Sequence, residues 1–98
     1  MLRPKSSFIV SNKHLRTALL TAIPIEPNDE REIAFTTNKG AVVIGGIPVT
    51  NEFSTDWEDF SIDRSKAMKL YELLRTISEQ PITVSYMHGN IMISHIMV

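Results

Sequence analysis

The chain has 98 residues, of which 43% are hydrophobic and 21% are charged, and its formal net charge is −1. These values fit one soluble domain and exclude a strongly basic nucleic-acid-binding chain, while no apolar run approaches the ~20 residues of a membrane span. Cysteine is absent, which excludes disulfides, zinc–thiolate sites and thiol nucleophiles. We therefore expect a cytoplasmic protein with no membrane partner and no secretory signal.

The first half of the chain predicts a strand at 6–10 followed by a helix. Ser11 suits the N-cap, because its hydroxyl can accept a hydrogen bond from a free backbone N–H of the first turn. The helix is indicated by apolar residues at the spacing of one helical face, and Pro24 is expected to end it. These apolar residues are Leu15, Ala18, Leu19, Ala22 and Ile23.

Three strands are expected next. Residues 32–37 and 41–44 flank a hairpin turn at 38–40, where a glycine suits a positive φ. Gly45 and Gly46 indicate a break or bulge in the ladder, and residues 47–53 predict a third strand interrupted by Pro48.

The second half predicts the same series of elements. A strand at 59–62 leads to a helix from about Arg64 to Ser78, capped by Asp63 or Ser65, with an inward apolar stripe. A strand from Ile82, a turn at 87–90 and a strand from Ile91 follow, and we expect no counterpart to the strand at 47–53. The stripe contains Ala67, Leu70, Tyr71, Leu74 and Ile77.

The two halves are nearly one pattern written twice. Residues of the first strand and helix recur 52 positions later, and the hairpins 33–44 and 82–93 have equal length with the turn in the same place. We predict an α+β fold in one domain, 1–98, with two helices packed on antiparallel sheet. A pseudo-two-fold axis should relate the halves, about 6–53 and 59–98.

Catalytic and metal motifs are absent from the sequence. His14, His88 and His95 lie in no metal-ligand spacing and beside no nucleophile motif. Asp29, Glu30 and Glu32 lack the spacing of a calcium loop, so a solvated acidic loop is the better interpretation. We predict a protein that is not an enzyme, with no cofactor and no metal.

Charge is distributed unevenly along the chain. The expected helices are mainly basic, whereas the connections contain two acidic clusters, and chance scatter of surface charge is the simplest explanation. Trp57, the only tryptophan, lies in the link between the halves, where it either fills the core or anchors a partner. Core filling is favoured. The clusters are Glu26, Asp29, Glu30 and Glu32, and Glu52, Asp56, Glu58 and Asp59.

The repeated strand–helix–strands pattern resembles one domain of the DNA sliding clamps. The likeness is best in FSIDRSKAMKLYELLRTI at 60–77 and PITVSYMHGNIMIS at 81–94, which look like the strand–helix–hairpin of bacterial clamp domains. The resemblance implies domains arranged head to tail around duplex DNA, with helices facing the channel and sheets facing outward. Clamp subunits contain two or three such domains, whereas this chain has one, and their interdomain peptide pocket cannot be carried over.

Two functional hypotheses follow. In the first, Lys13, Arg16, Lys66 and Lys69 contact duplex phosphates without reading bases, and copies self-associate through sheet edges, including an open edge at 91–98. In the alternative, the chain is a small inhibitor or immunity-type protein. Its acidic loop with Glu26, Asp29, Glu30 and Glu32, together with Trp57, would then bind an unknown protein.

Overall fold

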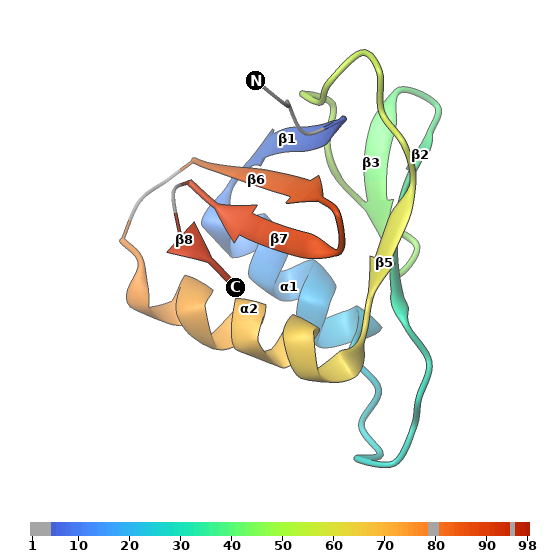
Figure 1. The fold of residues 1–98 in the computed structure, drawn as a ribbon, viewed down its shortest axis with the longest axis vertical. Coiled ribbons are helices and arrows are strands. Elements are labelled where there is room, and N and C mark those ends of the chain that lie inside the picture. Colours follow the sequence, from blue (N-terminus) through green and yellow to red (C-terminus); the bar gives the residue numbers. More distant parts are fainter. Residues whose placement is uncertain (1–4, 79–80, 95) are drawn as a thin grey trace.

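The computed structural model describes residues 5–78, 81–94 and 96–98. It confirms an α+β fold with two helices and antiparallel strands (Figure 1). The order of elements is strand, helix and three strands, twice over. The elements are β1 (Ser6–Val10), α1 (Asn12–Ala22), β2 (Ile33–Asn38), β3 (Ala41–Ile44), β4 (Ile47–Thr50), β5 (Phe60–Ile62), α2 (Arg64–Thr76), β6 (Ile82–Met87), β7 (Asn90–Ile93) and β8 (Ile96–Met97).

The strands form two four-stranded sheets, and the halves exchange their first strands. One sheet has the order β1-β6-β7-β8 and the other β4-β3-β2-β5, so β1 pairs with strands of the second half and β5 with strands of the first. The pairings match in register. Phe8 opposes Val84, and its counterpart Phe60 opposes Phe35, which corresponds to Val84 in the repeat. Each half therefore needs the other to complete its sheet.

The two sheets meet at the outer edge of β1. After β4, residues 51–54 run along β1, where Phe53 forms an isolated antiparallel bridge with Phe8. The N–H of Ile9 donates to the carbonyl of Glu52 at 3.0 Å, and the N–H of Ser54 donates to the carbonyl of Ser7 at 2.9 Å. Both edges of β1 are therefore paired.

Three tight turns that lie wholly within the described residues join neighbouring strands. Lys39 and Gly40, and their counterparts His88 and Gly89, all have positive φ, as a two-residue hairpin of mirror-image type requires. Of the break or bulge expected at 45–46, the bulge is wrong, because both glycines form a third such turn, between β3 and β4. The register shift lies instead between Val42 and Val43, where they face β4.

The expectation that the second half lacks a last strand is also wrong. β8 pairs with β7, with Ile93 opposite Ile96 and Met92 opposite Met97. Ile91 and Ile93 are buried, so the outer edge belongs to β8 and not to the whole segment 91–98. His95 lies outside the described residues. A two-residue strand carries too little periodicity to be found in a sequence.

The core lies between the helices and the inner faces of both sheets. Both helical stripes and the alternating residues of the strands converge there, as predicted. Fully buried side chains include Phe8, Leu15, Leu19, Phe35, Ile44, Leu70, Leu74, Ile82, Ile91 and Ile93.

Candidate nucleic-acid interface

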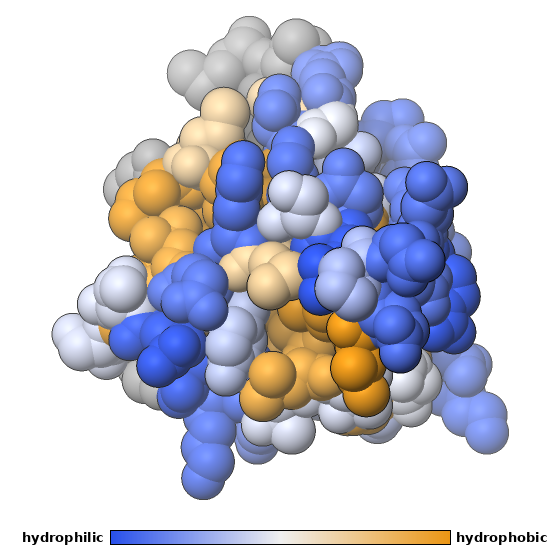
Figure 2. All heavy atoms as spheres, turned by 90° about the horizontal axis from the view of Figure 1, so that it is seen from below, coloured by the Kyte–Doolittle hydropathy of each residue, from blue (hydrophilic) through white to orange (hydrophobic). Residues whose placement is uncertain are grey.

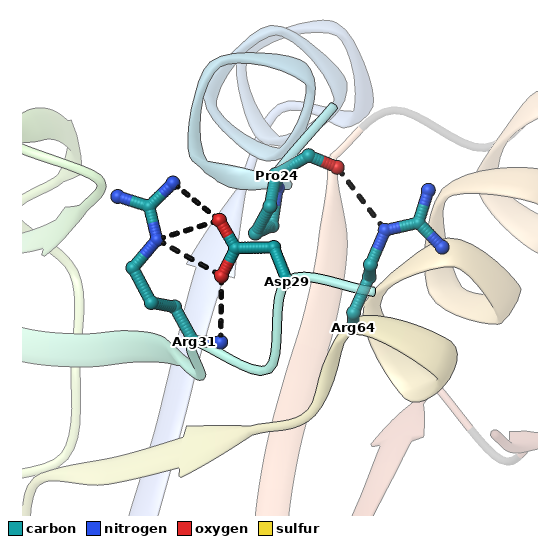
Figure 3. Close-up of polar contacts among 4 residues, drawn as sticks. All are labelled: Pro24, Asp29, Arg31 and Arg64. Atoms are coloured by element: carbon teal, nitrogen blue, oxygen red, sulfur yellow. Dashed lines mark hydrogen bonds and ion pairs between the residues drawn. The ribbon is translucent and has the colours of Figure 1, made fainter. Parts of the chain in front are cut away.

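The helices α1 and α2 lie side by side and are joined at both ends by their first residues. Asn12, which is buried, donates from Nδ2 to the carbonyls of Leu74 and Ile77 at 3.0 and 3.1 Å. Arg64, 52 positions later, donates from Nε to the carbonyl of Pro24 at 3.1 Å (Figure 3). The start of each helix thus caps the end of the other, and the helices run in opposite directions.

Each helix is also capped within its own half. The hydroxyl of Ser11 accepts from the N–H of His14 at 3.4 Å, and Oδ1 of Asp63 accepts from the N–H of Lys66 at 2.7 Å. The Ser11 cap was predicted, and of the two residues expected for the second cap, Asp63 or Ser65, the structure shows Asp63. Each side-chain cap thus pairs one of the free backbone N–H groups in the first turn of its helix.

Positive charge is concentrated on this helix pair. The two helices contain six basic residues and one acidic residue, Glu72, which forms an ion pair with Arg75 at 3.6 Å. The remaining residues of the chain contain four basic and ten acidic residues. The basic residues of the helices are Lys13, Arg16, Arg64, Lys66, Lys69 and Arg75.

The four cations expected to bind phosphate differ in their availability. Lys13 and Lys69 are exposed, one on each helix. Arg16 is half-buried and donates from Nε to Oδ1 of Asn12 at 2.9 Å, and Lys66 donates from Nζ to the carbonyl of Gly89 at 3.2 Å. Two of the four are thus committed to contacts inside the molecule.

Apolar side chains interrupt the charged surface of the helices. Leu20 on α1 is 60% exposed and Met68 on α2 is 40% exposed. A shallow groove runs along α2, lined by Met68, Leu73 and Glu72 and closed on one side by Pro27. Apolar atoms lie between hydrophilic ones on the side of the molecule seen from below (Figure 2). This mixture was not predicted, because the apolar spacing in the sequence indicated only the inward stripe of each helix.

The acidic loop after α1 contains an ion pair between Arg31 and Asp29. Arg31 donates from Nη2 to Oδ2 of Asp29 at 2.7 Å and from its backbone N–H to Oδ1 at 3.0 Å (Figure 3). The hydrogen bond from the Arg31 side chain is the main cause of the lowered pKa of the Asp29 carboxyl, and the hydrogen bond from the Arg31 backbone N–H is the next. Glu26 and Glu30 are exposed, and Glu32 accepts from the hydroxyl of Ser61 at 3.2 Å.

Trp57 belongs to an aromatic cluster at the joint between the halves. Its ring lies 5.9 Å from Phe8, 5.8 Å from Phe53 and 5.7 Å from Phe60, and Nε1 donates to Oδ1 of Asp59 at 2.7 Å. These contacts place the indole against the core, as the core-filling interpretation expected.

Other kinds of site find little support in the described residues. No three acidic or histidine side chains there are grouped so that they could hold a metal ion. Neither α1 nor α2 has the length and apolar character that crossing a membrane requires. Comparisons with family models, curated proteins and solved structures find no match to the chain.

Two functional features escaped the sequence interpretation. The contacts by which Asn12 and Arg64 join the helices could not be predicted from the sequence, although the two residues occupy equivalent positions of the repeat. A cleft beside β5, described below, arises from the exchange of strands between halves, which the repeat alone does not show.

Proposed function

We propose that the chain is a clamp-like domain that binds the backbone of duplex DNA through α1 and α2, without reading bases. The observation that supports this best is the segregation of charge, because the basic side chains gather on two adjacent helices while the rest of the chain is acidic. The repeated strand–helix–strands order supports the likeness to a clamp domain.

The chemistry of this surface suits phosphates better than bases. Lys13 and Lys69 can reach phosphate oxygens, whereas no phenylalanine or tryptophan lies on either helix and the one tyrosine there, Tyr71, is half-buried against the core, so stacking on unpaired bases is not favoured. Each phosphate neutralised makes log K fall by about 0.9 per unit of log salt concentration. Two free cations per copy give weak binding, so useful retention on DNA requires several copies.

Self-association through sheet edges would supply those copies. β8 is an outer strand with Ile96 46% exposed and Met97 60% exposed, and no charged side chain lies on it. An apolar edge of this kind favours pairing with another chain. Light scattering at high micromolar concentration should therefore show a mass above that of one chain.

The test compares retention of the protein on nicked circular and linear duplex at low salt. Lys13→Glu with Lys69→Glu should abolish retention, and Lys13→Ala with Lys69→Ala should lower the salt slope by about 2 per copy. The matched control, Lys5→Glu with Lys39→Glu, makes the same charge change away from the helices and should retain DNA binding. The proposal would be refuted if the helix variant and the control variant lost DNA retention equally. It would also be refuted if the unmodified protein were retained on neither DNA.

Protein binding through the loop after α1 is the second candidate. Ile25 is 92% exposed next to Glu26, an arrangement that costs free energy in water and suits a partner with an apolar and basic surface. Co-purification from the native host should then recover a protein that Ile25→Ser with Glu26→Lys loses. Recovery of the same set of proteins with this variant would exclude the candidate.

A further inference from the structure

The outer edge of β5 is open in the described part of the chain. β5 pairs with β2 on one side only. The two-residue turn at Lys39–Gly40 makes Asn38 and Ala41 a hydrogen-bonded pair. Along an antiparallel strand the backbone N–H and C=O groups of successive residues point alternately to the two sides, so those of Phe35 point toward β5. Phe60 and Ile62 therefore bond to β2, whereas the N–H and C=O of Ser61 point away from it.

The equivalent edge in the other half, the outer edge of β1, is paired with residues 52–54. This pairing provides a template for a segment bound to β5. β1 corresponds to β5, with Ile9 at the position of Ser61 and Ser7 at that of Asp59. The outward groups of Ile9 and Ser7 bond to Glu52 and Ser54 of the segment that follows β4. This fold thus accepts an extended antiparallel segment on the first strand of a half.

A cleft of about 670 Å³ lies where such a segment would run on β5. It is lined by Phe60 and Ser61 of β5, by the Glu58 and Asp59 that precede them, and by the β6–β7 turn. Phe60 is stacked on Tyr86 of β6 with ring centroids 4.1 Å apart, which closes the inner side of the cleft. Other residues of the lining include Glu32, Lys5, Met87 and His88.

The template and the charges define the segment that fits. Phe53, the residue opposite Phe8, packs its ring against Trp57, so the residue opposite Phe60 should also be apolar and turn inward toward the aromatic rings. Its two neighbours would point outward, where Glu32, Glu58 and Asp59 outnumber the single lysine, Lys5. Basic side chains are therefore favoured at those two positions.

We propose that the open edge of β5 binds an extended segment of a partner protein as an additional antiparallel strand, with an aromatic residue between two basic residues. Main-chain hydrogen bonds to Ser61 and Asp59 would provide the affinity, and the aromatic cleft with its acidic rim would provide the selectivity. This proposal does not depend on DNA binding by the helices, because the surface and the residues are different.

The probe is the peptide acetyl-Thr-Val-Lys-Phe-Lys-Val-Thr-amide, titrated against the full chain by calorimetry and by amide exchange. Binding should slow exchange at the N–H of Ser61. Ser61→Pro removes that donor from an edge strand and should weaken binding at least tenfold. Ser61→Ala keeps the donor and loses only the hydroxyl bond to Glu32, so it should bind within twofold of the unmodified chain.

Two altered peptides test the same contacts without changing the protein. In the first peptide, methylation of the backbone nitrogen of the second lysine removes the donor to the carbonyl of Asp59 and should weaken binding at least tenfold. In the second peptide, glutamate replaces both lysines, and this change should also weaken binding at least tenfold. Equal binding of the methylated peptide, or binding without protection of Ser61, would overturn the proposal. Protection of Ser61 that rises with protein concentration in the free chain would also overturn it, because a second copy would then occupy the edge.

Discussion

Asn12 shows how much one side chain does in this structure. It is 1% exposed, and it links the start of α1 to the end of α2 through two hydrogen bonds while accepting a third from Arg16. A buried amide is stable only when its polar atoms are paired, and here the partners of Asn12 are Leu74, Ile77 and Arg16, all within the helix pair and its end. The residue is therefore a support for the helix pair and not a ligand-binding group.

Replacement of Asn12 by alanine should destabilise the fold by about 2 kcal/mol. The change leaves two carbonyls at the end of α2 without their donor, and a buried polar group left unpaired costs roughly 1–3 kcal/mol. Urea denaturation measures the loss. Thr17→Ala on the exposed side of α1 is the control and should change stability by less than about 0.5 kcal/mol, and an equal effect of both variants would contradict this role.

Asp29 gives a prediction for pH. Its folded-state pKa is lowered by the hydrogen bonds from Arg31, so its contribution to order in the loop is present above the ordinary pKa of 3.8 and is lost as the pH falls through the lowered value. Titration by carbon NMR should place the Asp29 midpoint below 3.8. In Arg31→Ala the midpoint should return toward 3.8, and an unchanged midpoint would show that Arg31 is not the cause.

At the scale of elements, the β3–β4 turn packs directly against the end of α1. Gly45 has φ +58°, and a Cβ added there would lie 2.7 Å from Cβ of Ala22 at the end of α1. Gly46 has φ +81°, but a Cβ added there would meet no atom within 4 Å. Both glycines thus need a positive φ, and only at Gly45 is there also no space for a side chain.

This difference predicts unequal costs for two adjacent substitutions. Gly46→Ala should cost about 1–2 kcal/mol, the price of a left-handed backbone for a residue with a side chain. Gly45→Ala should cost about 2–4 kcal/mol, because the turn or α1 must also shift. Urea denaturation of both variants makes the comparison, and Gly46→Ala equal to or worse than Gly45→Ala would contradict the packing described.

The whole molecule is held together by the exchange of β1 and β5. Because each half completes the other's sheet, and because the core is shared by both helices, neither half can bury its apolar residues alone. The pseudo-symmetry is therefore a property of the assembled domain and not of two independent units.

Fragments 1–53 and 59–98, prepared separately, should each give the far-UV circular dichroism of an unfolded chain. The intact protein should unfold in one transition, with Trp57 fluorescence and circular dichroism following the same curve. A fragment with native-like dichroism and cooperative melting, or two separate transitions in the intact chain, would show that the halves fold independently.

The class of fold, the positions of both helices and the two matching hairpins could all be predicted from the residues alone. Those features depend on local chemistry: the spacing of Leu15 and Leu19, the caps at Ser11 and Asp63, and the turn at Lys39–Gly40 all act over a few residues. The division of charge between helices and connections is likewise a property of sequence alone.

How the repeated elements pair depends on contacts between residues far apart in the chain. The exchange of β1 and β5, the contact of Lys66 with Gly89 and the cleft beside β5 all join such residues. The short β8 and the contact of Arg16 with Asn12 are local in the chain, but neither leaves a periodic pattern in the sequence. Periodicity describes which face of an element is apolar, but it does not say which partner covers that face. That choice is made by packing and hydrogen bonding across the whole domain.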